Sequence, residues 1–148
     1  MKSVSLCSLA FLLASCLGFK NFQVQENARP AELARLAMHS ELTLLEINGT
    51  RILYWRRLQM PPGKYELKVS FSREVGGHDL FLVKTRKVTL NAGDTHYVCP
   101  VLTYNRVNDL QDFDFDIVVD NEFEPMLLPA DEIDYVPPKC RRKDDIYR

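Results

Sequence analysis

The residues of this chain that are best suited to chemistry are carboxylates in its last third. Asp112, Asp114 and Asp116 alternate with Phe113 and Phe115, and further acidic residues flank them: Asp109, Asp120, Glu122 and Glu124. Converging carboxylates are ligands that Ca²⁺ prefers. Alternation with phenylalanine is also typical of a strand with one apolar and one solvated face, and the run lacks the glycine and ligand spacing of a calcium loop. We favour the solvated face and keep Asp112, Asp114 and Asp116 as candidate metal ligands.

The histidines show no spacing that predicts a metal site or catalysis. His39, His78 and His96 lie far apart in the sequence, although Asp79 and Asp94 lie close to the last two. A zinc site needs three or four converging ligands, and closely spaced histidines are its usual trace in a sequence. The chain also has no Gly-x-Ser-x-Gly motif, no phosphate-binding loop and no evident Cys/His nucleophile. We therefore expect no cofactor, no resident metal and no enzymatic activity.

The first sixteen residues predict where the protein resides. The apolar stretch from Val4 to Leu13 is too short for a bilayer-spanning helix, which needs about twenty residues, but it suits a signal peptide. It leads into Leu13-Ala14-Ser15-Cys16, which resembles a bacterial lipobox. The resemblance implies cleavage after Ser15, a diacylglyceryl group on the thiol of Cys16, and acylation of the new amino terminus. An ordinary secretion signal is the alternative, but it gives no reason for the cysteine.

Lipidation at Cys16 would fix the protein to the cell envelope. One acyl chain holds a protein only marginally, whereas several chains make release negligible. In bacteria with two membranes, lipoprotein sorting resembles a rule in which Asp after the lipidated cysteine retains the protein at the inner membrane. Leu17 stands at that position. The resemblance therefore implies the outer membrane, with the folded domain in the periplasm.

The length, the charge and the two later cysteines limit what the mature chain can be. Removal of residues 1–15 leaves 133 residues with a formal charge of −2, enough for one domain with its own core and without a basic field for nucleic acid. Cys99 and Cys140 then remain, and an oxidising compartment allows them to pair. A buried thiol at Cys99 with a loose one at Cys140 is the alternative, and we leave both open.

The middle of the chain predicts short β-strands separated by turns. Asn48-Gly49 lies between two apolar runs and is the strongest hairpin signal, because both residues tolerate the positive φ angles of a type I′ turn. Pro100 cannot donate a ladder hydrogen bond, which predicts an edge strand or a break there. Residues 31–38 suit either a helix or a first strand, and we favour the strand. The other expected strands are 42–47, 50–55, 65–71, 81–90 with a bulge near its middle, 95–104 and 113–119.

Six or seven such strands indicate an all-β fold, a small antiparallel β-sandwich, with a small open β-barrel as the alternative. We expect a signal peptide at 1–15, a tether at 16–30, the β-sandwich at 31–120 and an irregular, Pro-rich C-terminal arm at 121–148. Residues 46–49, 60–69 and 88–97 carry turns and strands in an order that resembles PEGA-like periplasmic modules. The resemblance implies a fold and a scaffold or adhesion role, and it carries no active site.

The sequence is compatible with three functions. The first is a non-catalytic, envelope-anchored lipoprotein whose β-sandwich presents a protein-interaction module, with the membrane and an envelope protein as its partners. The second is a solute- or Ca²⁺-binding periplasmic lipoprotein. An envelope hydrolase comes third. The C-terminal arm either packs over the sandwich, where a Cys99–Cys140 disulfide could staple it, or docks onto a partner, since isolated apolar groups in a Pro-rich segment suit a groove or a sheet edge.

Overall fold

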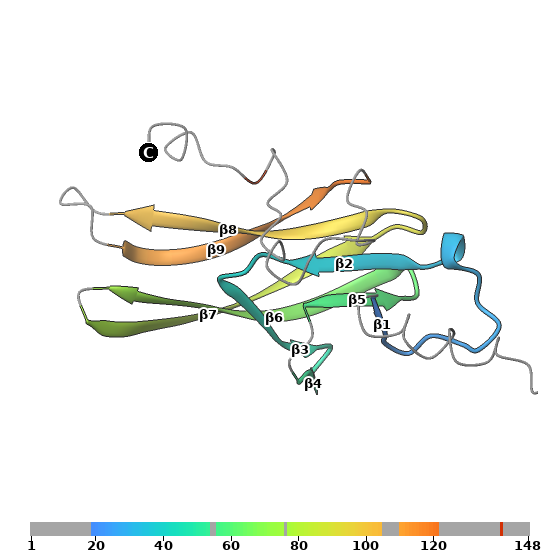
Figure 1. Cartoon of the computed structure of the whole chain (residues 1–148), viewed down its shortest axis with the longest axis horizontal. Helices are drawn as coiled ribbons and strands as arrows, with labels where there is room; N and C mark the ends of the chain where they lie inside the picture. The colour runs from blue at the N-terminus through green and yellow to red at the C-terminus, as the bar shows by residue number, and fades with distance from the viewer. Residues whose placement is uncertain (1–18, 54–55, 76, 105–109, 122–139, 141–148) are drawn as a thin grey trace, which may run out of the picture.

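Two β-sheets packed face to face form the part of the chain that the computed structural model describes, residues 19–53, 56–75, 77–104, 110–121 and 140 (Figure 1). The first sheet has the strand order β1-β5-β2-β8-β9, and the second has the order β4-β3-β6-β7. A short 3₁₀ helix, η2 (Pro30–Glu32), precedes β2. The strands are β1 (Lys20–Asn21), β2 (Ala34–Met38), β3 (Leu42–Ile47), β4 (Thr50–Arg51), β5 (Arg57–Met60), β6 (Gly63–Val75), β7 (His78–Leu90), β8 (Thr95–Tyr104) and β9 (Leu110–Val119).

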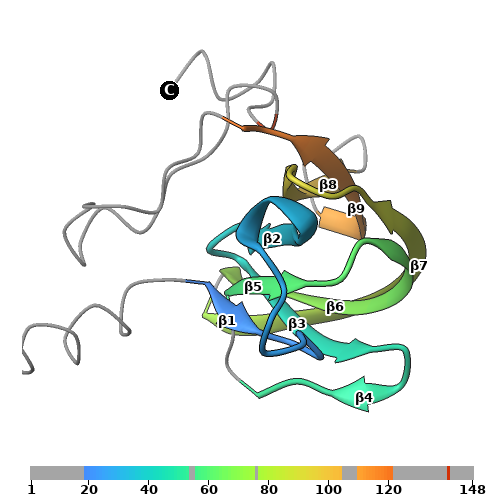
Figure 2. The same ribbon diagram turned by 90° about the vertical axis from the view of Figure 1, so that its right-hand side faces the viewer.

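This architecture confirms the predicted all-β sandwich. Neighbouring strands are antiparallel except for β1 with β5 and β2 with β8. The sheets do not close into a barrel, and the described residues form nine strands, two of them only two residues long. No helix within these residues is long and apolar enough to cross a membrane. Figure 2, turned by 90°, shows the two sheets as separate layers.

One core lies between the two sheets. Alternate residues of each strand point inward, so the apolar positions of both sheets meet there. A fully buried Leu, Ile or Phe contributes about 1.5–3 kcal/mol relative to leaving it exposed. The side chains with at most 1% exposure in this cluster are Ala34, Leu36, Leu42, Leu44, Ile47, Leu58, Met60, Leu67, Val69, Phe71, Leu90, Val98, Phe113 and Phe115. Of the residues 31–38, Ala34–Met38 form strand β2 and supply part of this core, as the sequence favoured, whereas residues 31 and 32 belong to η2.

The turn at Asn48-Gly49 has the predicted geometry. Asn48 and Gly49 have φ angles of 49° and 77°, and Ile47 pairs directly with Thr50, as in a two-residue type I′ hairpin. The Asn48 side chain also accepts a hydrogen bond from the Glu66 N–H at 2.8 Å, which ties the turn to β6. The returning strand is shorter than predicted: β4 ends at Arg51, and residues 54–55 lie outside the described part of the chain.

The turn at Pro61-Pro62 is a crossover between the sheets. It joins β5 of the first sheet to β6 of the second, so the chain changes layers there. The Tyr65 hydroxyl donates a hydrogen bond to the Pro61 carbonyl at 2.6 Å and holds the crossover against β6. Burial of this side chain raises the pKa of the Tyr65 hydroxyl above its ordinary value, so it keeps the proton that it donates.

Strand β7 does not contain the predicted bulge. Its register with β6 is unbroken from Gly63 opposite Leu90 to Val75 opposite His78. The hydrophobic alternation is interrupted because two inward positions are basic, Lys84 and Arg86. The shifts of register lie elsewhere, between β3 and β6 after Leu44 and between β8 and β9 after Thr103.

Pro100 lies inside β8, which continues through it between β2 and β9. The Val98 carbonyl accepts a hydrogen bond from the His39 N–H, so it faces β2. Backbone groups two residues along a strand point to the same side, and β2 has already ended at Met38. The missing N–H of Pro100 therefore costs no ladder hydrogen bond. Strand β8 as a whole is not an edge strand, but at Pro100 it has no neighbour on the β2 side.

The predicted tether at residues 16–30 includes residues 20–22, which belong to the sandwich. Lys20 and Asn21 pair with β5, and the Phe22 N–H donates to the Gln59 carbonyl at 2.8 Å. Phe22 is only 8% exposed and belongs to the core, because its ring supplies apolar area that outweighs the polar residues around it. The sandwich therefore starts before the predicted boundary at residue 31.

Candidate functional site

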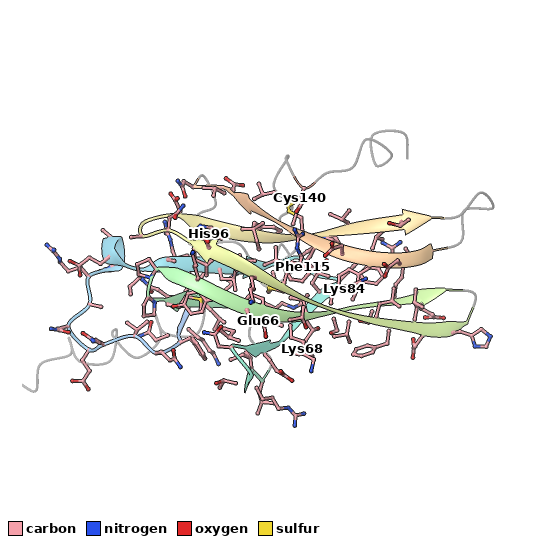
Figure 3. The ribbon with its side chains drawn as sticks, turned by 180° about the vertical axis from the view of Figure 1, so that it is seen from behind. Glu66, Lys68, Lys84, His96, Phe115 and Cys140 are labelled. Carbon is pink, nitrogen blue, oxygen red and sulfur yellow. A yellow bond between two sulfur atoms is a disulfide. The ribbon has the colours of Figure 1, made fainter. Side chains whose placement is uncertain are left out.

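The carboxylates singled out in the sequence lie where β9 of the first sheet meets β7 of the second. We name this region the ion-paired edge: Lys84, Arg86, Asp112, Asp114 and Asp116. Lys84 Nζ lies 2.9 Å from Asp112 Oδ2, and Arg86 Nη1 lies 3.8 Å from Asp114 Oδ1 and 3.2 Å from Asp116 Oδ1. Figure 3 shows Lys84 and Phe115 on this side of the sandwich. The two sheets are thus joined by charges along one side.

Arg86 makes the most varied contacts of this group. Its Nη1 donates a hydrogen bond to the Phe115 carbonyl, and its guanidinium carbon lies 5.9 Å from the centre of the Phe115 ring. A cation over an aromatic face and a charged donor on a backbone carbonyl are both attractive contacts. Arg86 therefore covers a β9 carbonyl that has no strand partner.

The aspartates also cover β9 donors. Asp112 Oδ1 accepts a hydrogen bond from the Phe113 N–H at 2.9 Å, and Asp114 Oδ1 accepts one from the Phe115 N–H at 2.8 Å. Strand β9 is the last strand of the first sheet, so these N–H groups face away from β8. Unpaired edge groups invite another strand, and charged side chains on an edge oppose such pairing. The alternation of Asp and Phe thus gives β9 a buried inner face and a guarded edge.

Ion pairing also shifts the pKa values of Lys84 and Asp112. The hydrogen bond to Asp112 raises the pKa of Lys84, and the hydrogen bond from Lys84, aided by the Phe113 N–H, lowers the pKa of Asp112. The charged forms of both Lys84 and Asp112 are therefore favoured.

Asp112, Asp114 and Asp116 do not form a metal site in the structure. Within the described residues, no three His, Cys, Asp or Glu side chains are placed to hold a metal ion. A calcium ion at these aspartates would have to displace Lys84 and Arg86 from them. The solvated strand face that we favoured from the sequence agrees with this arrangement, since all three aspartates are exposed and both phenylalanines are buried. The neighbours Asp109, Glu122 and Glu124 lie outside the described residues.

The three histidines lie on separate elements. His78 is exposed at the start of β7, and His39 Nδ1 accepts a hydrogen bond from the Glu41 N–H at 3.2 Å. The Glu41 carboxylate is held by Arg73, whose Nε lies 2.8 Å away. His96 is only 1% exposed, and its Nε2 accepts a hydrogen bond from the Asn91 N–H at 3.1 Å.

Burial lowers the pKa of His96 below its ordinary value, although backbone groups of Arg35 and Asp94 and the Asp94 charge oppose the shift. His96 is therefore a neutral acceptor inside the fold.

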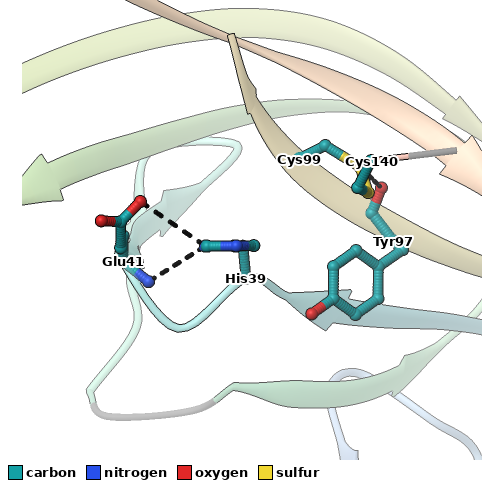
Figure 4. Close-up of a disulfide and its surroundings, with 5 residues drawn as sticks. All are labelled: His39, Glu41, Tyr97, Cys99 and Cys140. Atoms are coloured by element: carbon teal, nitrogen blue, oxygen red, sulfur yellow. Dashed lines mark hydrogen bonds and ion pairs between the residues drawn. A yellow bond between two sulfur atoms is a disulfide. The ribbon is translucent and has the colours of Figure 1, made fainter. Parts of the chain in front are cut away.

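A disulfide joins Cys99 on β8 to Cys140, with Cα atoms 5.4 Å apart (Figure 4). It lies on the outer face of the first sheet, where a second apolar cluster consists of the buried side chains of Ala37, Tyr97 and Cys99. Phe19, Val118 and Cys140 pack against this cluster. The bond therefore fixes one point of the C-terminal arm over this outer face. The rest of the arm, residues 122–139 and 141–148, lies outside the described residues.

The second sheet offers a different kind of surface. Phe81 and Val83 are 61% and 39% exposed on the outer face of β7, although both are large apolar side chains. A shallow depression of about 480 Å³ lies farther along the same strands, lined by Asn48, Lys64, Tyr65, Glu66, Lys87, Val88 and Thr89. Neither feature was singled out from the sequence. The outward positions of β7 could have been found only with the strand register, because Phe81 and Val83 look like core residues in a run of apolar letters.

Two predicted features lie outside the described residues: the signal peptide at 1–15 and the lipidation site Cys16. Comparison of the chain with protein-family models, curated proteins and solved structures finds no match.

Proposed function

We propose that this chain is a non-catalytic, lipid-anchored protein of the bacterial envelope whose β-sandwich presents a protein-interaction surface. The anchor rests on the lipobox resemblance of Leu13-Ala14-Ser15-Cys16. The first described strand, β1, begins four residues after Cys16. The resemblance to PEGA-like modules supports a scaffold or adhesion role in the periplasm, at the outer membrane.

The interaction role rests on one observation, the exposed apolar pair Phe81 and Val83. Both lie on β7, which is an edge strand of the second sheet. Their cross-strand neighbours are Ser72 and Ser70, so the pair is an apolar island on an otherwise polar part of the sheet. Exposed apolar groups beside an edge strand are typical of a surface that another protein covers.

Intact mass spectrometry of the membrane-fraction protein tests the anchor. We expect a chain that begins at Cys16 and carries the added mass of three acyl chains, and Cys16→Ala should abolish that mass and free the protein from membranes. An unmodified chain cut at another residue contradicts the anchor and would indicate a secreted domain.

Photo-crosslinking in the bacterial cell tests the interaction surface. A photoreactive phenylalanine at position 81 should capture a defined envelope protein, and Val83→Lys should reduce that capture roughly tenfold, since burying an unpaired charge in an apolar contact is costly. The matched control is the same photoreactive residue at Thr85, on the same face but closer to the middle of β7. Equal capture from both positions, or capture that Val83→Lys leaves unchanged, contradicts the surface.

A further inference from the structure

The distance between the lipid anchor and the fold limits how the domain can be oriented. Cys16 and Lys20 are four positions apart, and four residues span at most about 14 Å when fully extended. Lys20 is fixed to β5 by its pairing with Leu58, and Phe22 is buried in the core two residues later. Once Cys16 is acylated, β1 must therefore lie close to the lipid headgroups.

Strand β1 lies on the side of the sandwich opposite the ion-paired edge. The first sheet ends in β1 on one side and β9 on the other, and the second sheet ends in β4 and β7. Because β9 lies beside β7, β1 and β4 both belong to the other side. After β4 the next strand of the chain is β5, which lies beside β1 (Figure 2).

Residues 47–65, which include β4 and β5, carry charge of one sign. Between Glu46 and Glu66 the sequence has no carboxylate and four basic residues, Arg51, Arg56, Arg57 and Lys64. Arg51 and Arg56 are exposed, as is Lys20 on β1, and Leu53 between them is 57% exposed. The nearest carboxylate along β3, Glu46, is held by Lys68 at 2.9 Å. We name Lys20, Arg51, Leu53 and Arg56 the basic side.

We propose that the basic side lies against the anionic phospholipid headgroups of the bilayer that holds the anchor. The inference rests on the proposed acylation of Cys16 and adds the orientation of the domain to it. Basic residues near an anionic leaflet are attracted to it over about one Debye length, roughly 8–10 Å. The link to Cys16, at most about 14 Å long, keeps Lys20 near that range. An exposed leucine among them can enter the interface. Phe81 and Val83, on β7, then point away from the membrane and toward a partner.

The lone tryptophan of the chain, Trp55, can report this orientation because it is covalently joined to Arg56. The acylated full-length protein would be placed in vesicles of phosphatidylethanolamine and phosphatidylglycerol whose acyl chains carry bromine near the headgroups. We expect the bromines to quench Trp55 fluorescence roughly twofold, as for aromatic rings at the membrane interface. The matched control moves the tryptophan to the other side, by Trp55→Phe with Phe81→Trp, and should show almost no quenching.

A charge reversal separates electrostatic contact from simple proximity. Arg56→Glu should reduce the quenching of Trp55, whereas Lys87→Glu, on the outer face of β7, should leave it unchanged. Intact mass is measured on every variant. A chain without acyl mass overturns the proposed anchor together with this orientation. An acylated chain whose Trp55 is unquenched, whose control tryptophan is quenched as strongly, or whose quenching ignores Arg56→Glu overturns the orientation alone.

Discussion

The guanidinium carbon of Arg86 lies 5.9 Å from the centre of the Phe115 ring, and Nη1 of the same side chain donates a hydrogen bond to the Phe115 carbonyl. One side chain of the second sheet therefore contacts the face of a buried ring and the backbone of an edge strand in the first sheet. This contact explains why a basic residue occupies an inward position of β7.

Loss of the Arg86 head group should weaken the contact between the sheets. Arg86→Met keeps an apolar stem but removes the contacts to Phe115 and Asp116, so we expect the free energy of unfolding to fall by about 1 kcal/mol. Urea denaturation measures this change. Lys87→Met, on the opposite face of β7, is the control and should change stability by less than about 0.5 kcal/mol. Equal effects of the two substitutions would contradict the role given to Arg86.

The guarded edge of β9 should keep the protein from self-associating. Replacing Asp112 and Asp114 together by Val removes the side-chain acceptors of the Phe113 and Phe115 N–H groups. We expect this variant to form dimers or larger species by edge pairing, visible in light scattering after size-exclusion chromatography. Asp116→Val removes a charge that contacts Arg86 and should stay at the size of the unmodified protein. Self-association of Asp116→Val to the same extent would mean that lost charge, and not uncovered N–H groups, is responsible.

The buried His96 should make stability depend on pH. Its pKa is lowered in the fold, so the unfolded chain takes up a proton first as the pH falls below about 6.5. The unfolded state binds more protons in that range, and stability is therefore full above it and is lost toward the lower pKa of the folded state. For a single proton the loss cannot exceed about 1.4 kcal/mol per pH unit.

Urea midpoints measured between pH 7.5 and pH 5 test this dependence on His96. His96→Gln supplies an oxygen that can accept from the Asn91 N–H and does not titrate, so this part of the slope should disappear. A slope that is unchanged in His96→Gln would assign the dependence to another group. The lowered pKa of Asp112 acts in the same direction but in the acid range of a carboxylate.

The disulfide should contribute to stability through the loop that it closes. Cys99 and Cys140 are 41 residues apart in sequence, and in the chain-entropy model a loop of that size stabilises by about 3–4 kcal/mol. We expect the double variant Cys99→Ser with Cys140→Ser to lose stability of that order, and a reducing agent to destabilise the unmodified protein equally. A reducing agent that still lowers the stability of the double variant would point to an effect elsewhere.

Local signals in the sequence were enough to predict most of the fold. Asn48-Gly49 fixes a turn through two residues that tolerate positive φ, and the Asp and Phe alternation of β9 matches its exposed and buried faces. The predictions failed where a residue was explained by a distant neighbour. Lys84 and Arg86 looked like a bulge because their partners lie on β9, about thirty residues later.

The prediction of where the domain starts failed for a similar reason. Residues 19–22 are too few to predict a strand, and only β5 shows why Lys20 and Phe22 belong to the fold. The candidate site was predictable in its residues, since the aspartates stood out at once, but not in its chemistry. Lys84 and Arg86, which pair with these aspartates, can be identified as their partners only once β7 and β9 are known to lie side by side.

The parallel pairing of β2 with β8 sets an order for folding. All strands of the second sheet lie within residues 42–90 and join mainly through hairpins. In the first sheet, Arg35 pairs with Thr95, so β2 and β8 can pair only after the second sheet has been synthesised. Contacts between neighbours in sequence form faster than distant ones. A chain that emerges from its amino terminus therefore completes the second sheet early, with Leu67, Val69 and Phe71 uncovered until β8 and β9 arrive. We expect the chain to be most prone to aggregation in that interval.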